Sequence, residues 1–419
     1  MIKTRDAVRS SLDSIANLII SWNPIDPHIR MQQASFLSSL KYYWKYDAST
    51  LPQGVKILLD YLRAKDEKNI VSMNNFGPNF SNEIIALKKK SGICLVSISN
   101  HIPHLLVPWL AELSVQAKTI LATDELLSLN RMHMYEFLSC VATAVVDPIA
   151  RVTFISDVLS SSFEVLESKE VKETLSSMDA FLMSLGIGQA RANPSFVIDH
   201  ENVQNITEKY VRLFSAINQL LSVGKRCHQA AKKRPNYGLP MQNIDKSISN
   251  ADVDTHENFP DEGPVSINEL AFNDPFVPLW HRLLPIVLRI ADLTFGLWHP
   301  TCQAAMLPNA VQRYVFAISD DEVYLAKKQE SGNSGVFGKG GTAGSVISGW
   351  DRRKHNLAPR WSGWFNELRN TSLQFFGLLA DQRVLFAPEM SDMFPQFVSV
   401  VCNPDHLRAM EHRHFTQYL

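Results

Sequence analysis

The fold is decided by stretches such as Thr4-Arg-Asp-Ala-Val8-Arg-Ser-Ser-Leu12-Asp-Ser-Ile15-Ala-Asn-Leu18-Ile19-Ile-Ser-Trp22. Its apolar residues recur at intervals of three and four, from Val8 through Leu12 and Ile15 to Ile19, which places them on one face of a helix. We therefore predict an amphipathic helix over 4–22. Similar patterns predict further helices over 27–46, 52–62, 81–98, 105–113, 124–146, 149–167, 169–186, 204–231, 276–298, 358–380 and 403–414.

Strand patterns are rare in the chain. One short run, Phe394 to Val401, has the composition of a strand, but no strands alternate with helices as a parallel sheet requires. The predicted fold class is therefore all-α. Helix pairs recurring about every 40–47 residues are typical of HEAT or armadillo repeats. We predict a HEAT/armadillo-like α-solenoid, a right-handed superhelix of antiparallel helix pairs, with a compact helical bundle as the alternative.

Two segments interrupt the helical pattern. Residues 235–275 combine five prolines with an acidic patch, which predicts a long loop. Residues 331–349 are too rich in glycine to sustain a helix. The predicted organisation is helical repeats over 1–234, a Pro-rich acidic loop over 235–275, repeats again over 276–330, a Gly-rich basic loop over 331–356 and final repeats over 357–419.

The composition is that of a soluble globular protein. The 419 residues are 45% apolar and 20% charged, with a net charge of −1, which excludes a polycation and an acidic disordered chain. The five cysteines are scattered, so we expect buried free thiols in a reducing compartment. The N-terminus lacks the apolar core of a signal peptide, and the apolar stretch 276–298 contains four charged or histidine side chains. We expect no membrane insertion and a location in the nucleus and cytoplasm.

No pattern in the chain supports catalysis, a cofactor or a metal. The sequence around Gly338, Lys339 and Gly340 fails the Walker pattern, because no Ser or Thr follows the lysine. His101 and His104 are three residues apart with no Glu or Cys at metal-ligand spacing. We therefore expect a protein that is not an enzyme.

Basic clusters are the candidate functional residues. Singly, each can be a solvated helix end, where cations favour the helix dipole. Together on one curved face they could contact RNA phosphates, because RNA helices are recognised by shape and backbone. The candidate RNA-binding residues in these clusters are Lys88, Lys89, Lys90, Lys225, Arg226, Lys232, Lys233, Arg234, Arg352, Arg353 and Lys354.

The order of several short motifs resembles the middle portion of the exportin-5 family of karyopherin-β nuclear transport receptors. The segments that carry the resemblance are Ile84 to Lys90, Ile102-Pro-His-Leu-Leu-Val-Pro108, Asp124 to Leu138, Leu175 to Leu182 and Asn273 to Pro300. Their spacing is nearly gapless over 84–146.

The resemblance implies a HEAT-repeat export receptor that binds Ran GTPase and structured RNA or protein cargo, with nuclear pore components as further partners. The resemblance implies that Lys88 and Lys89 occupy the positions of two adjacent arginines in the family. It also implies that Asn130 lies near the unpaired end of a bound RNA. The family's N-terminal repeats and C-terminal arch are absent, so we expect a fragment, a truncated gene model or a degenerate paralogue. The alternative is a generic HEAT-repeat scaffold that binds proteins through apolar grooves and scatters its basic residues over the convex face.

Overall fold

The computed structural model describes residues 2–65, 81–123, 126–187, 200–234, 266–297 and 358–403. Every regular element within these ranges is a helix, so the all-α prediction is confirmed there. The chain divides into two compact units: unit 1 comprises 1–159, 222–237 and 273–276, and unit 2 comprises 160–221, 238–272 and 277–419. The helices pack in pairs, which is consistent with an α-solenoid.

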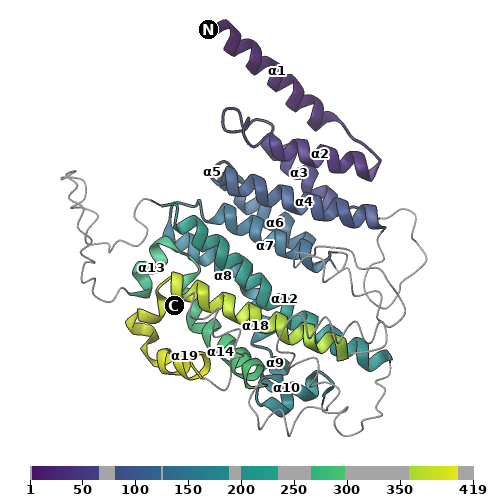
Figure 1. Ribbon diagram of the computed structural model, residues 1–419. Coiled ribbons are helices and arrows are strands. Elements are labelled where there is room, and N and C mark those ends of the chain that lie inside the picture. Colours follow the sequence, from purple (N-terminus) through teal and green to yellow (C-terminus); the bar gives the residue numbers. More distant parts are fainter. Residues whose placement is uncertain are drawn as a thin grey trace, which may run out of the picture. The chain divides into compact units, whose positions relative to one another are not determined.

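Unit 1 is built from helices that follow one another along the chain (Figure 1). They are α1 (Ile2–Ser21), α2 (Pro27–Ser39), α3 (Leu51–Leu62), α4 (Asn82–His101), α5 (Pro103–Leu106), the 3-10 turn η1 (Val107–Trp109), α6 (Leu110–Leu121), α7 (Ser128–Ala142), most of α8 (Pro148–Leu166) and the C-terminal part of α12 (His200–Ala231).

Local signals set where these helices begin. Asp26 precedes Pro27, and its Oδ1 accepts hydrogen bonds from the backbone N–H groups of His28 and Ile29 at 2.8 and 3.2 Å. Ser81 caps α4 by accepting from the N–H of Ile84 at 3.4 Å. Both are the side-chain types that satisfy the unpaired donors of a first helical turn.

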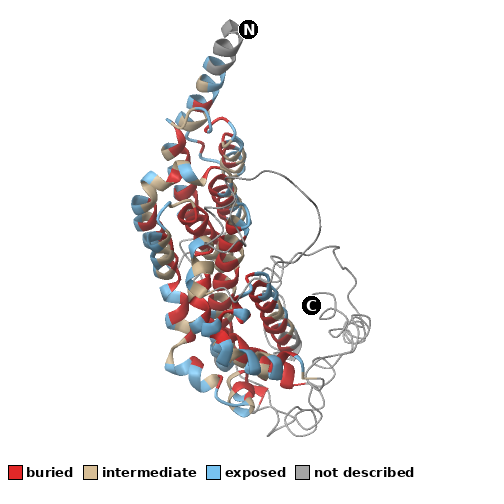
Figure 2. Cartoon of the chain, turned by 90° about the vertical axis from the view of Figure 1, so that its left-hand side faces the viewer, coloured by how far each residue is buried: buried red, intermediate tan, exposed pale blue. Residues whose placement is uncertain are grey.

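The core of unit 1 is centred on α4, which packs against α2, α3 and α7. Leu87, Leu95 and Ile98 of α4 are fully buried, and the buried residues line the facing sides of the helices (Figure 2). Gly92 lets α7 approach closely, because a Cβ there would lie 2.5 Å from Nδ1 of His133. Helix contact of this closeness requires a residue without a side chain.

Helix α1 keeps much of its apolar face in water. Leu12, Ile15 and Leu18 are exposed, with Leu18 at 70%, as is Trp22 directly after the helix, and Figure 2 shows much of the coloured part of α1 as exposed. The sequence predicted that these residues share one face of an amphipathic helix, which they do. Polar contacts help to hold the C-terminal end of α1, because the Gln33 amide of α2 donates to the carbonyls of Ile19 and Trp22 at 2.6 and 2.7 Å.

Unit 2 is also helical throughout its described ranges. It contains the end of α8, α9 (Lys169–Thr174), α10 (Met178–Ser184), the first part of α12, α13 (Ile267–Asn273), η3 (Val277–Leu279), α14 (Trp280–Gly296), α18 (Ala358–Asp381), η6 (Val384–Phe386), η7 (Pro388–Met393) and α19 (Phe394–Val401). Its core lies between α14 and α18. There the buried Trp280 indole donates to Gln382 at 2.6 Å and contacts the ring of Phe375 edge-on.

The strand prediction for Phe394–Val401 is wrong, because this segment is helix α19. Its β-branched residues favoured a strand, but Pro395 suits a first helical turn, and Val400 and Val401 become buried where α19 packs on α14. Tertiary packing therefore overrides local preference.

Several helix boundaries also differ from prediction; for example, the region predicted as one helix over 105–113 is divided among α5, η1 and α6, and α6 continues to Leu121. The helix predicted over 27–46 ends at Ser39, and the one predicted over 169–186 is split into α9 and α10, because Ser177 caps a new helix by accepting from the N–H of Ala180. Residues 267–273, predicted as loop, form α13. Most of the helix predicted over 403–414 and all of the loop 331–356 lie outside the described residues.

Candidate nucleic-acid interface

The three lysines of α4 have different environments. Lys88 is fully buried, Lys90 is half-buried and Lys89 is exposed. Lys88 lies on the buried stripe of Ile84, Leu87 and Ser91, at helical spacing of three and four. The position of Lys88 therefore does not suit direct contact with a phosphate, whereas Lys89 and Lys90 remain candidates.

Asn130 is likewise not on a surface. It is fully buried on α7, and neither polar atom of its amide has a hydrogen-bond partner within the described residues. The resemblance placed it near an RNA end, but a fully buried amide cannot line an open path in this structure.

Arg226 forms an internal cross-link between α12 and α7. Its Nε and Nη2 donate to the carboxylate of Glu136 at 3.2 and 2.9 Å, and Ser222 Oγ donates to the other carboxylate oxygen at 3.0 Å. The side chain of Glu136 is 10% exposed and that of Arg226 is 28% exposed. Burial also lowers the pKa of the neighbouring Lys225. Arg226 thus acts first as a structural residue.

The basic residues that follow α12 have two different roles, since one binds backbone carbonyls and two are exposed to solvent. Arg234 donates to the backbone carbonyls of Asn273 at 2.8 Å and Thr143 at 2.6 Å, which fixes the chain after the helix. Lys232 and Lys233 are exposed. The predicted contacts Arg352, Arg353 and Lys354 lie outside the described residues.

A cluster around His101 was missed by the sequence analysis. His101, at the end of α4, contacts Tyr42 edge-on with ring centroids 4.7 Å apart, and Tyr42 is 60% exposed. Lys41 lies over the Tyr42 ring at 5.3 Å and donates to Ser97 at 2.7 Å. We call Lys41, Tyr42, Lys45, His101 and Lys233 the His101 cluster. Its signal is present in the sequence as Lys41-Tyr-Tyr-Trp-Lys45-Tyr, lysines interleaved with aromatics.

The lysines of the His101 cluster act on the His101 ring. Desolvation lowers the pKa of His101, and the positive charges of Lys45, Lys41 and Lys233 lower it further. Burial also lowers the pKa of His133; Glu136 opposes this shift, and Lys89 and Arg226 add to it. Nε2 of His101 has no hydrogen-bond partner within the described residues. His101 therefore lies in the positive field of three lysines, while its own Nε2 is buried.

No group of three or more His, Cys, Asp or Glu side chains in the described ranges is arranged to hold a metal ion. Cys94, Cys140 and Cys227 are buried free thiols, as predicted, whereas Cys402 is exposed and Cys302 lies outside the described residues. No single described helix has the length and apolarity of a membrane span; only the pair 82–101 and 103–121, bent by 104°, meets those criteria jointly.

These features define an all-helical protein of packed helix pairs whose unit 1 gathers exposed lysines with aromatic side chains. No family model matches the chain. It is similar to Exportin-5 of Dictyostelium discoideum, with 22% identity over 334 residues, covering 77% of this chain and 26% of that protein. The chain therefore spans about a quarter of the length of the curated relative it matches. The similarity supports an exportin-like or karyopherin-like relationship.

Proposed function

We propose that this chain has the function of a karyopherin-like nuclear transport receptor, folded as a right-handed superhelix of HEAT-like repeats. The observation that carries the proposal is the similarity to Exportin-5 over 334 residues, supported by the packed helix pairs. Such a receptor binds and releases its cargo without making or breaking a covalent bond, and it moves between nucleus and cytoplasm.

The proposed cargo is structured RNA. Lys45, Lys89, Lys232 and Lys233 are exposed in unit 1, and ammonium groups on a helical surface suit the phosphates of an RNA helix. Tyr42 adds an exposed aromatic ring next to Lys41 and His101. These residues replace Lys88 and Asn130 as the ones to test.

A filter-binding titration with a hairpin RNA tests the cargo. The double variants Lys45→Glu/Lys233→Glu and Lys89→Glu/Lys90→Glu should each weaken binding at least tenfold and reduce the salt dependence of the affinity, because fewer counterions are released. Lys169→Glu is the matched control, since Lys169 lies in unit 2 and its side chain is 89% exposed. Affinity that does not change with salt would refute RNA binding.

The proposed second partner is Ran GTPase. In the proposed transport function, Ran and cargo each change the other's affinity for this chain, and the two changes are equal in size. Hairpin RNA binding should therefore strengthen when GTP-loaded Ran is added and remain unchanged with GDP-loaded Ran. Nuclear pore components complete the proposed set of partners.

One observation favours the scaffold alternative. The exposed apolar residues of α1 and α2, including Trp22 and Ile29, form a surface that suits protein partners better than RNA. If the hairpin RNA fails to bind while Leu18→Glu abolishes binding of a helical protein partner, the chain is a protein-binding scaffold.

A further inference from the structure

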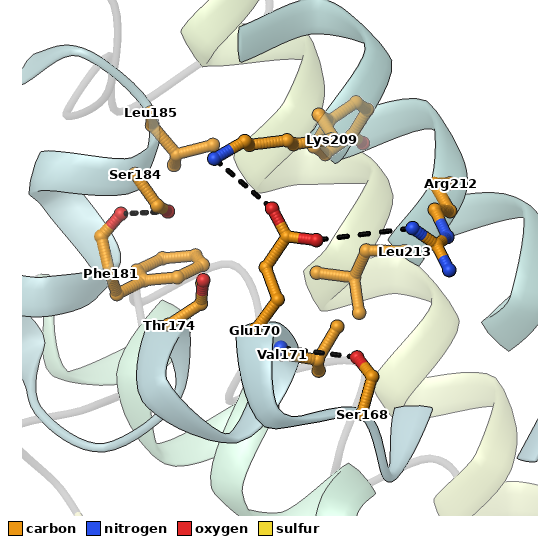
Figure 3. A pocket seen from close by; sticks show the side chains of 11 residues that line it. Ser168, Glu170, Val171, Thr174, Phe181, Ser184, Leu185, Lys209, Arg212 and Leu213 are labelled. Carbon is orange, nitrogen blue, oxygen red and sulfur yellow. Dashed lines mark hydrogen bonds and ion pairs between the residues drawn. The ribbon is translucent and has the colours of Figure 1, made fainter. Parts of the chain in front are cut away.

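A hollow in unit 2 combines an apolar floor with a cationic rim (Figure 3). It lies between α9, α10 and α12. Val171, Phe181, Leu185 and Leu213 supply its buried apolar lining. The space that the centres of water molecules can occupy is about 30 Å³, room for roughly two or three waters. The hollow therefore accepts the end of one apolar side chain rather than a whole organic molecule.

The rim holds two cations and one carboxylate. Glu170 of α9 lies 3.0 Å from Nζ of Lys209 and 3.9 Å from Nη1 of Arg212, with the carboxylate between them in Figure 3. The side chains of all three are about half exposed. One carboxylate for two cations leaves the rim with a net positive charge.

Arg212 is the cation with unused binding capacity. Its distance to Glu170 is beyond hydrogen-bond range, and its guanidinium makes no hydrogen bond within the described residues. A guanidinium presents a planar fork of donors that matches a carboxylate bidentately. Its exposed pairing with Glu170 contributes little, so a second carboxylate can displace it at small cost.

We propose that this hollow binds a peptide segment in which one apolar side chain lies next to an Asp or Glu. The apolar side chain fills the hollow between Val171 and Leu213, and the neighbouring carboxylate accepts from the fork of Arg212. Lys209 stays paired with Glu170. The charge complementarity selects an acidic peptide over a neutral or basic one. This inference does not rest on the proposed transport function.

Fluorescence anisotropy with labelled ten-residue Gly/Ser peptides tests the proposal on the full chain. Each peptide carries a central Val, Leu, Ile, Met or Phe followed by Glu; matched peptides carry Gln in place of Glu, or Ser in place of the apolar residue. At least one Glu peptide should bind saturably. Gln in place of Glu should weaken that binding about two- to fivefold, the range for an ion pair made by a half-exposed guanidinium. Ser in place of the apolar residue should weaken it at least tenfold.

Substitutions in the chain test whether the peptide binds at this hollow. Arg212→Glu should abolish it, and Arg212→Lys should weaken it because the fork is lost. Ser184→Leu, which fills the hollow from α10, should also weaken it. Lys172→Glu, an exposed charge change on α9 outside the lining, should have at most a twofold effect. Circular dichroism melts verify that each variant is folded. Absence of saturable binding to every Glu peptide, equal binding of Glu and Gln peptides, or binding unchanged by Arg212→Glu overturns the proposal.

Discussion

Replacing Arg226 by alanine should destabilise unit 1, although the residue lies in a cluster predicted to contact RNA. Its guanidinium supplies two of the three side-chain hydrogen bonds that the Glu136 carboxylate accepts, and the third comes from Ser222. Alanine would leave a nearly buried carboxylate with one hydrogen bond. The cost is therefore set by the charge that remains and not by the side chain that is lost.

The magnitude follows from the exposure of the two side chains. Removing one partner of a fully buried ion pair costs about 3–5 kcal/mol, and an exposed pair contributes about 0–1 kcal/mol. Glu136 is 10% exposed and Arg226 is 28% exposed, which places this pair between the two limits. We expect Arg226→Ala to cost about 2–3 kcal/mol. Glu136→Gln should cost about 1–2 kcal/mol, because Arg226 can turn to water.

The assay must measure the unfolding of unit 1 separately, because the chain has two compact units that can unfold independently. The buried thiol of Cys140 on α7 provides this report, because its labelling in urea follows the opening of the α7 contacts. Lys118→Ala is the control, since Lys118 pairs with Asp157 at 2.7 Å with both side chains about half exposed, and it should cost about 0–1 kcal/mol. A cost below about 0.5 kcal/mol for Arg226→Ala would refute the reasoning.

Three further predictions concern unit 1. Gly92→Ala should destabilise it by about 1–2 kcal/mol in urea unfolding, because the added methyl meets His133 and the gain in helix propensity only partly offsets the clash; unchanged stability would contradict the close contact. Burial lowers the pKa of His133 below its ordinary value of 6.5, so stability should be constant above pH 6.5 and fall as pH drops toward the lowered pKa, where the unfolded chain binds the proton first; His133→Gln should flatten that fall. Burial raises the pKa of the Cys140 thiol to about 11, so under native conditions alkylation should label Cys402 well before Cys140, and mass spectrometry giving the reverse order would disprove the burial.

The fold class was predictable because helical periodicity depends on residues close together in the chain. The apolar spacing along 84–98 predicted α4 within a few residues of its observed bounds. The same spacing could also have predicted the burial of Lys88, because Lys88 is four residues from Ile84 on the buried stripe. The run of three lysines instead suggested that all three lie on a basic surface. Segment 394–401 could not be predicted in this way, because its helix depends on packing against α14.

The candidate site was predictable only in part, since it joins distant segments. Lys41 and Lys45 are distant in sequence from Lys233, yet all three charges act on His101, and no local pattern encodes that arrangement. The hydrogen bonds of Arg226 and Arg234 could not be predicted either, because their partners Glu136, Thr143 and Asn273 are far away in sequence.

The solvent-exposed apolar face of α1 should affect how the purified protein behaves at high concentration. Leu18 is 70% exposed and Trp22 is 48% exposed, so covering both would return about 2–3.5 kcal/mol before the entropy of association is subtracted. Purified chains should therefore become polydisperse as they are concentrated, and a detergent-like additive or a charged residue at position 18 should restore a single species in light scattering.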